Sequence, residues 1–428
     1  MESTAHIEET DSGRSGPRKG LSTNLLVKFS QFSELGEERL SVIAAQSSVE
    51  RVSRNQRLID RGTEDDCVLF LIKGSLRLES GDGAARVLES DSPAARYAVS
   101  YLSPHRYTVT ANSTAKVLRV SRALLESNQQ ERTSQSYVVE NIETGNELRD
   151  NLLFHEVYQA CINETLKLPS LPDVAMKVRT AVEDERADAA KVARVVEADP
   201  PIAAKLIKAA NSAYAGVQKP VDKTSAAIVR LGMKTTKQLV ISFALKDLFD
   251  AGTPVLQKRM KKLWIESAEI AATCFVFAEM HPKFEPETAL LAGLLHDIGI
   301  IPIVAYSRNY PDIAVRPDQL ERVIEKLRGQ IGCMILRYWG LSDDMVSVAV
   351  ESDDWFRMPS EPPDYCALVM FAKYLAAAGQ PGNKNFPPVN NIPSFVALGL
   401  GDLDPERSED LANKVRDRVL QTNALLET

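Results

Sequence analysis

The hydrophobic period of this sequence changes from helical to strand-like after residue 45 and is helical again from residue 166 onward, and this pattern constrains the fold more than any other feature. Between about residues 57 and 120 the apolar residues form short strand-like runs broken by glycine, such as 57–62 and 67–78. From residue 166 onward no strand periodicity appears, and apolar residues recur at helical spacing. We therefore expect a multidomain α+β chain, with an N-terminal β-barrel or jelly roll and a C-terminal all-α domain.

Length and local composition divide the chain into four parts. Its 428 residues suffice for two to three domains. Residues 1–21 are polar and lack the apolar core of a signal peptide, so we expect a disordered tail. A helix over 25–45 opens the first domain, which we place at 22–128 and which a second helix closes. A polar connector covers 129–165, and the helical domain covers 166–428.

The charge and cysteine content exclude several functional classes. A net charge of −7 gives no broad electrostatic footprint for nucleic acid. The five cysteines stand far apart and form no CxxC pair, which argues against a zinc ribbon or a disulfide framework. Together with the absence of an export signal, this usage is typical of a reducing cytoplasm, so we predict a cytoplasmic protein.

The apolar stretch 290–301 ends a predicted helix with two polar residues, His296 and Asp297. Glu285 and Pro286 suit a helix start, and Gly299 lies where a helix would stop. The pair makes the stretch too interrupted for a membrane span. A carboxylate in such a place requires an ion pair, hydrogen bonds or a bound cation. The pair is therefore a metal-ligand pair or a hydrogen-bonding pair within a core.

The connector 129–165 carries apolar residues at irregular helical spacing. Its apolar stripe could pack on a second copy of the chain and make a homodimer, or pack on the chain's own domains. The sequence leaves both arrangements open.

The first domain resembles the cyclic-nucleotide-binding domain. The resemblance rests on FSELGEERL at 32–40, on residues 54–78 with Gly62 and Gly74 on either side of a predicted strand, and on PHRYTVTANSTAKVLRVSRALL at 104–125. It implies a β-barrel with flanking helices that senses a ligand or mediates assembly.

The ligand site of that family is altered here. The family holds phosphate and ribose with a Gly-Glu pair, a short helix and an arginine. This chain has 92–97, SPAARY, where the Gly-Glu pair should fall. An alignment on Thr108 puts His105 at the arginine position, with Arg106 one step away. We expect a degenerate barrel, with Arg96, His105 and Arg106 as the candidate anion or nucleotide contacts.

The second domain resembles the HDOD domain, a relative of the HD phosphohydrolases found in bacterial signalling proteins. Four segments match in order and spacing: LPSLPDVA at 168–175, VEADPPIAAKLIKAANS at 196–212, AAIVRLG at 226–232 and AGLLHDIG at 292–299. The resemblance implies an HD-like helical fold.

The resemblance also implies that the metal-ligand set of the active HD enzymes is incomplete here. Glu266 stands at the place of an upstream histidine, Arg328 at that of a downstream one. One ligand pair does not hold a catalytic divalent ion, because three or more protein ligands are usual. We therefore treat His296, Asp297, Glu266 and Arg328 as a remnant of the HD site (the HD remnant), and predict no cofactor, no metal and no catalytic residue. Arg328 is expected to pair with Asp297 or Glu266, although a weak Mg²⁺ site at Glu266 and Asp297 stays open.

Residues 351–354, ESDD, lie where some family members carry paired histidines. We expect them to form a solvated acidic loop.

These observations predict a non-catalytic bacterial signal-transduction protein that relays a state to protein partners, with a nucleotide as one ligand class for its first domain. The alternative is a metal-dependent nucleotide phosphodiesterase or phosphohydrolase of the HD type. A nucleic-acid-binding regulator is the weakest interpretation, because of the negative charge and the lack of a helix-turn-helix pattern.

Overall fold

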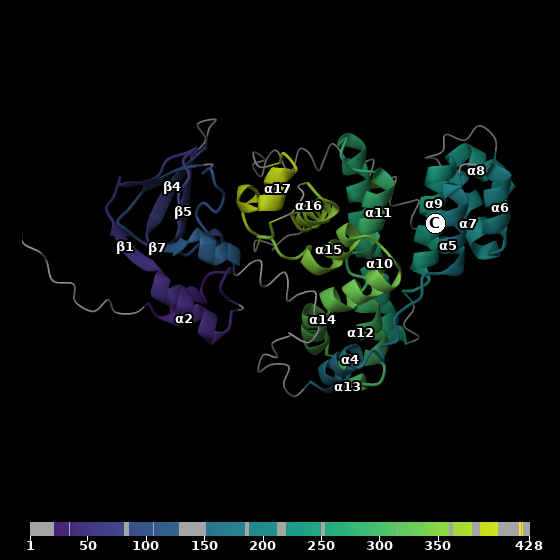
Figure 1. The fold of residues 1–428 in the computed structure, drawn as a ribbon, viewed down its shortest axis with the longest axis horizontal. Helices are drawn as coiled ribbons and strands as arrows, with labels where there is room; N and C mark the ends of the chain where they lie inside the picture. The colour runs from purple at the N-terminus through teal and green to yellow at the C-terminus, as the bar shows by residue number, and fades with distance from the viewer. Residues whose placement is uncertain are drawn as a thin grey trace, which may run out of the picture. The chain divides into compact units, whose positions relative to one another are not determined.

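The structure is a computed structural model in which two compact units divide the chain, Met1–Leu125 and Glu126–Thr428 (Figure 1). It describes residues 21–33, 35–80, 85–105, 107–127, 151–184, 188–211, 220–249, 253–314, 316–358, 363–378, 386–400, 419–420 and 422. Residues 1–20 of the expected tail and 129–150 of the expected connector lie outside this set.

Within the described residues of the first unit, seven antiparallel strands in two sheets form its centre. One sheet has the order β1-β7-β3, with bounds Ser48–Val52, Ala115–Ser121 and Cys67–Lys73. The other has the order β2-β6-β4-β5, with bounds Arg57–Ile59, Thr108–Ala111, Ser75–Glu79 and Ala85–Glu89. Apolar side chains of both sheets, among them Val52, Leu71, Leu76 and Val117, share one core. The β-barrel or jelly-roll prediction is thereby confirmed.

Gly74 makes the crossing from the first sheet to the second possible. It lies between β3 and β4 with a φ of 94°, a conformation that side chains disfavour. A Cβ atom there would also lie 2.7 Å from the carbonyl oxygen of Thr114. Glycine is therefore required at this corner for both reasons.

Short helices flank the sheets: α1 (Thr23–Leu26), α2 (Glu37–Gln46) and η1 (Pro93–Arg96). The single helix predicted over 25–45 is wrong, because Gly36 is extended and caps the start of α2. Between α1 and α2, Phe29 and Phe32 pack on Phe70 of β3. Burial of these rings, rather than helical spacing, dictates the path of the chain here.

The second unit is helical throughout its described residues, which confirms the all-α prediction. Its elements are α4 (Leu152–Ile162), α5 (Asp173–Glu183), α6 (Ala189–Glu197), α7 (Pro200–Ala210), α8 (Thr224–Leu231), α9 (Met233–Lys246), α10 (Pro254–Met280), α11 (Pro286–Leu295), α12 (Ile300–Ser307), α13 (Pro311–Ala314), α14 (Pro317–Tyr338), α15 (Asp343–Glu351), α16 (Tyr365–Ala378), η4 (Val389–Asn391) and α17 (Pro393–Ala397).

Two hydrophobic cores divide this unit into lobes. The first lobe comprises α5 to α9, and the second comprises α4 and α10 to α17. Helix α9 of the first lobe contacts α11 of the second. In α4, Leu153, Phe154 and Val157 are buried in the core of the second lobe, against α12 and α14.

Helix starts follow the local sequence. Asp188 and Asp199 cap α6 and α7 by accepting hydrogen bonds from Lys191 N and Ile202 N. Proline lies at the first or second position of α7, α10, α11 and α14, where its missing N–H costs nothing.

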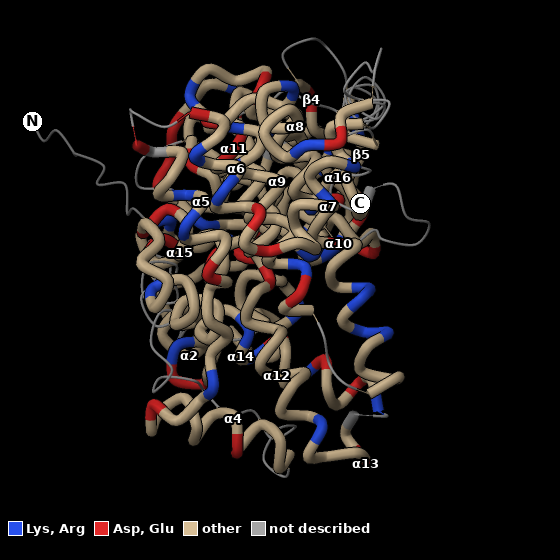
Figure 2. Tube along the Cα trace, turned by 90° about the vertical axis from the view of Figure 1, so that its right-hand side faces the viewer, with Lys and Arg blue, Asp and Glu red and all other residues tan. Residues whose placement is uncertain are grey.

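The stretch Pro286–Ser307 is long and apolar enough to cross a membrane, but 78% of its most apolar window is buried inside the protein. Such burial is typical of a core helix. Basic and acidic residues are interspersed over the helices of the second unit (Figure 2).

Candidate functional site: the HD remnant

His296 and Asp297 lie in the turn between α11 and α12, in the core of the second lobe. Helix α11 ends at Leu295, with His296 at its C-cap, and α12 begins at Ile300. Gly299 does not act as a left-handed helix stop, since its φ is −65°. A Cβ on Gly299 would instead lie 1.9 Å from the carbonyl oxygen of Arg328. Glycine at this position therefore allows α14 to approach the turn.

This close approach brings Arg328 to Asp297. The guanidinium Nη1 of Arg328 donates to Asp297 Oδ1, and its Nη2 donates to Asp353 Oδ2. Lys373 of α16 donates from Nζ to the other Asp353 oxygen at 2.5 Å. The four charges form one chain, Asp297–Arg328–Asp353–Lys373, in which the two carboxylates are balanced by two cations.

His296 is held on both sides of its ring. Its Nδ1 lies 2.8 Å from the carbonyl oxygen of Gly293, so Nδ1 is the nitrogen that donates. Its Nε2 lies 3.3 Å from Asp297 Oδ2, where a protonated ring would form an ion pair. The imidazole is 5% exposed, so it is a fixed part of the core.

The surrounding charges control the ionisation of both carboxyls. Burial alone would raise the pKa of Asp297, but Arg328 and His296 outweigh it and hold the pKa well below its usual value. For Asp353, burial would again raise the pKa, but Lys373 and Arg328 outweigh this effect and lower it. Both groups are therefore carboxylates at neutral pH. Asp297 and Asp353 also raise the pKa of Arg328 against the effect of burial, which keeps it charged.

The structure brings together three of the four residues of the HD remnant. Glu266, on α10, is half exposed, and its ion-pair partner is Lys262, one turn earlier on the same helix, at 3.5 Å. Among the described residues, no group of three or more His, Cys, Asp or Glu side chains has the arrangement of a metal site.

The prediction of a solvated loop at 351–354 is wrong for Glu351 and Ser352, which are buried. Asp353 is exposed, as expected, but it also belongs to the charge chain at the HD remnant. Buried Arg357 donates to Glu351 at 2.6 Å and to both carboxylate oxygens of Asp364, at 2.7 and 3.1 Å. Asp364 in turn accepts from Ala367 N and caps α16. This second network fixes the segment that carries Asp353.

Asp353 and Lys373 are the site residues that the sequence analysis missed. They lie 25 and 45 positions beyond Arg328 in sequence, Asp353 in the turn after α15 and Lys373 on α16. A lysine inside the apolar run of α16 was the available signal, because a buried ammonium needs a carboxylate partner.

The candidate anion contacts of the first domain are not assembled into a site in the described residues. Arg96 is exposed at the end of η1, and Arg106 lies outside the described residues. His105 is buried, with its Nδ1 2.9 Å from Ser100 Oγ and its Nε2 3.3 Å from Asp65 Oδ2. A carboxylate beside the imidazole opposes the binding of an anion there.

The backbone of His105 forms hydrogen bonds that connect two loops of the first unit. Its backbone N–H donates to Thr63 O at 2.9 Å, and its carbonyl accepts from Gly62 N at 2.8 Å. The residue thus joins its own segment to the loop between β2 and β3.

Comparisons with known proteins place relatives of this chain mainly over its second unit. Residues 168–354 match the HDOD domain family. A curated relative, an uncharacterised protein of Treponema pallidum (strain Nichols), is 21% identical over 219 residues, which cover 47% of this chain. The chain's match spans about two fifths, 40%, of the length of that relative.

Solved structures show the same similarity. A candidate metal-dependent phosphohydrolase from Shewanella amazonensis SB2B has a TM-score of 0.54 and 24% identity, and the match covers 64% of this chain and 98% of that one. An HDOD domain protein from Geobacter sulfurreducens has a TM-score of 0.48 and 19% identity, over 64% of this chain and 96% of that one.

For the first unit, a cyclic-nucleotide-binding-like protein from Brucella abortus has a TM-score of 0.20 and 18% identity, over 24% of this chain and 94% of that one. The helical unit is the part that a family match identifies: residues 168–354 of this chain are an HDOD domain.

Proposed function

We propose that this chain is a non-catalytic, cytoplasmic signal-transduction protein of a bacterium, whose HDOD domain passes a conformational state to a protein partner. One observation carries the proposal: Arg328 bridges Asp297 and Asp353 with its guanidinium. In an HD hydrolase the carboxylate at the position of Asp297 would have to offer an oxygen atom to a metal ion that activates water. In this chain the guanidinium of Arg328 already forms an ion pair with that carboxylate.

The charge balance supports the same conclusion. A divalent ion binds where carboxylates leave negative charge unneutralised. The chain Asp297–Arg328–Asp353–Lys373 has two negative and two positive groups, so a metal ion would have to displace at least one cation from a partly buried ion pair.

The first domain fits sensing or assembly better than classical cyclic-nucleotide binding. Arg96 is exposed, and His105 faces Asp65 rather than an open anion site. A ligand or partner that binds better to one arrangement of the two domains would raise the population of that arrangement. Residues 129–165, which join the domains, would pass this change from one domain to the other. A homodimer is compatible with this role, although the apolar residues of α4, within the expected connector, pack on the chain's own second lobe.

The rival function is that of a metal-dependent nucleotide phosphodiesterase. The direct test is hydrolysis of cyclic-di-GMP, cAMP and ppGpp by the full chain in the presence of Mn²⁺ or Mg²⁺. We expect no turnover above buffer. Turnover that is lost in Asp297→Asn, and kept in a Lys326→Gln control on the exposed side of α14, would establish the rival instead.

A further inference from the structure

Helix α10 leaves one side uncovered over about three turns, although its opposite side, with Met260 and Leu263, is buried in the core of the second lobe. The uncovered side carries six exposed residues that recur at spacings of three and four: Lys258, Lys261, Lys262, Ile265, Glu266 and Glu269. Such spacing places side chains on one face of a helix. We call these six residues the outer α10 face.

The charges of the outer α10 face are separated along the helix. Its N-terminal end carries Lys258, Lys261 and Lys262, blue in Figure 2, and its C-terminal end carries Glu266 and Glu269. In the part of the chain that the structure describes, one ion pair lies on this face, between Lys262 Nζ and Glu266 Oε1 at 3.5 Å. Within that part, Lys258, Lys261 and Glu269 have no ion-pair partner, so the face has a basic end and an acidic end with uncompensated charge.

The two carboxylates of the acidic end repel each other. Glu266 and Glu269 are three residues apart and are therefore neighbours on the helix surface. Partial burial raises the pKa of Glu269, and the negative charge of Glu266 raises it further. A cation brought to this end from another molecule would relieve the repulsion.

The basic and acidic ends lie at nearly equal distances from the middle of the face. At a rise of about 1.5 Å per residue, Lys262 and Glu266 each lie about 3 Å from the level of residue 264, on opposite sides. Lys258 lies about 9 Å before that level and Glu269 about 8 Å after it. A second α10, antiparallel about a twofold axis at this level, would therefore present an acid opposite each of these lysines.

Such self-complementarity is what a twofold dimer requires, because the same surface of both copies must fit itself. The centre of the face also has an apolar contact to offer. Ile265 is 41% exposed and lies one residue from the twofold axis, where it would pack on Ile265 of the second copy.

We propose that two copies of this chain associate through the outer α10 face, as an antiparallel pair of α10 helices. Lys258 of each copy pairs with Glu269 of the other, and Lys262 with Glu266. An acidic partner protein would bind the lysines only and would leave the two glutamates without a cation. A second copy of the chain satisfies both ends of the face at once.

The small size of the face makes this dimer weak. A stretch of twelve residues, 258–269, is about 18 Å long and about 10 Å wide, a footprint of roughly 200 Å² per copy against about 800 Å² in a standard interface. Exposed ion pairs add little free energy each. We therefore expect a Kd of about 10 μM or weaker, with a strong dependence on salt.

This inference rests on the proposed function in one respect, since a homodimer compatible with signal relay is here given its surface. A weak, reversible dimer is a state that a ligand or partner can shift.

The test is analytical ultracentrifugation of the full chain from about 5 to about 500 μM, a range that spans the expected Kd. We expect the wild type to pass from monomer to dimer as its concentration rises. Replacing about 50 mM NaCl by about 500 mM should raise the Kd about threefold or more, because salt screens exposed charges.

Charge reversal tests the pairing itself. Lys258→Glu with Lys262→Glu gives both ends of the face acidic residues, and Glu266→Lys with Glu269→Lys makes both ends basic. Each double variant alone should have a Kd about tenfold or more above that of the wild type, because like charges then meet across the twofold axis. An equal mixture of the two variants should dimerise again, because an acidic face then meets a basic one.

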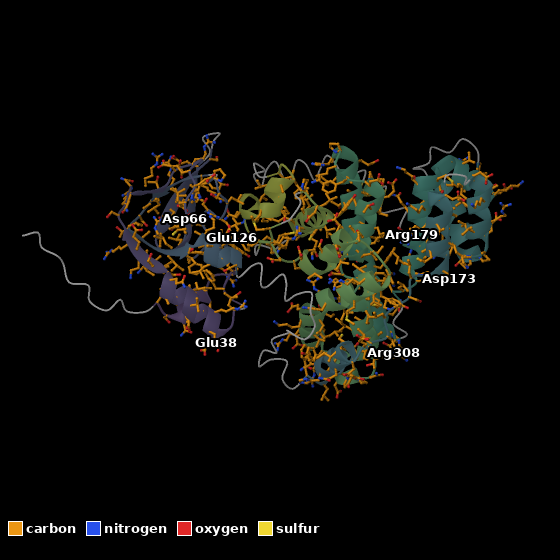
Figure 3. The ribbon with its side chains drawn as sticks, viewed as in Figure 1. Glu38, Asp66, Glu126, Asp173, Arg179 and Arg308 are labelled. Atoms are coloured by element: carbon orange, nitrogen blue, oxygen red, sulfur yellow. The ribbon has the colours of Figure 1, made fainter. Side chains whose placement is uncertain are left out.

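The matched control reverses two exposed basic residues of the first lobe, Lys177→Glu on α5 and Arg194→Glu on α6. Helix α5 begins at Asp173, which is labelled in Figure 3. This variant has the same net charge as Lys258→Glu with Lys262→Glu but keeps the outer α10 face, so it should dimerise as the wild type does. Circular dichroism checks that each variant is folded.

The proposal is overturned if the wild type stays monomeric over the whole range, if either folded α10 variant dimerises as tightly as the wild type, or if their mixture stays monomeric. A monomeric wild type would remove this surface and leave the signalling role standing, because a different protein could still receive the state. Turnover in the hydrolysis test would instead remove the signalling role and leave the dimer unaffected.

Discussion

Arg328 and Asp297 form an ion pair across 31 residues of sequence, at the place where the HD motif would present a carboxylate to a metal ion. The pair exists because α14 lies against the α11–α12 turn, which Gly299 makes possible by having no Cβ atom. The same guanidinium reaches Asp353, so that one side chain connects α14 to two other parts of the lobe.

Arg328→Ala should lower the free energy of unfolding by about 3 kcal/mol, because it leaves the mostly buried carboxylate of Asp297 without its arginine partner, while Asp353 keeps Lys373. Urea denaturation followed by circular dichroism measures this loss. Lys326→Ala, two residues earlier on the exposed side of α14, is the matched control and should change stability by less than about 0.5 kcal/mol. Equal effects of the two variants would show that the Arg328 network contributes nothing specific.

Gly299→Ala should destabilise the second unit strongly. Its new methyl group would meet the carbonyl of Arg328 at 1.9 Å, so that the α12 and α14 backbones must separate. Gly329→Ala is the matched control on α14: its Cβ would find only ordinary contacts, the nearest at 3.4 Å. Because alanine favours the helix, Gly329→Ala should be neutral or should stabilise by about 0.5–1 kcal/mol. Thermal melts of Gly299→Ala and Gly329→Ala measure this difference. Equal melting temperatures of the two variants would contradict the close packing of α14 against Gly299.

Acid should weaken the fold through Asp297. Its folded-state pKa lies well below the ordinary value of 3.8, so its stabilisation is fully present above that value and is lost as the pH falls toward the folded-state pKa. The difference in unfolding free energy between wild type and Asp297→Asn should therefore be constant from pH 7 to about 5 and shrink below about pH 4. A difference that stays constant down to pH 3 would contradict this electrostatic account.

Arg357→Ala should cost about 3–5 kcal/mol, since Glu351 and Asp364 would remain buried without a cation. The variant should also loosen the segment that carries Asp353. Hydrogen exchange of the amides at the start of α16, which Asp364 caps, measures this effect. Protection that is unchanged in the folded variant would show that Asp364 caps α16 without help from Arg357.

Much of the architecture could be predicted because it depends on local rules. The strand runs around Gly62 and Gly74, and the Asp199-Pro200 helix start, are set by neighbours in sequence. The sequence narrowed the partner of Arg328 to Asp297 or Glu266, and in the structure the partner is Asp297. Glu351 was wrongly expected to lie in a solvated loop, because acidic residues in a row indicate solvent exposure as long as their partners are unknown; its partner is the buried Arg357. The exposed Asp353 was expected to be solvated, but its contacts with Arg328 and Lys373 arise only when α14 and α16 pack together.

The central claim is that side-chain cations have replaced the metal ion at the HD remnant. The most direct measurement is calorimetric titration of metal-stripped wild-type protein with Mn²⁺, beside the double variant Arg328→Gln, Lys373→Gln. We predict no Mn²⁺ binding to the wild type at His296 and Asp297, and measurable binding once the two cations are removed and the carboxylates freed. Stoichiometric Mn²⁺ binding by the wild type that disappears in Asp297→Asn would contradict the claim and return the chain to the metal-dependent hydrolases.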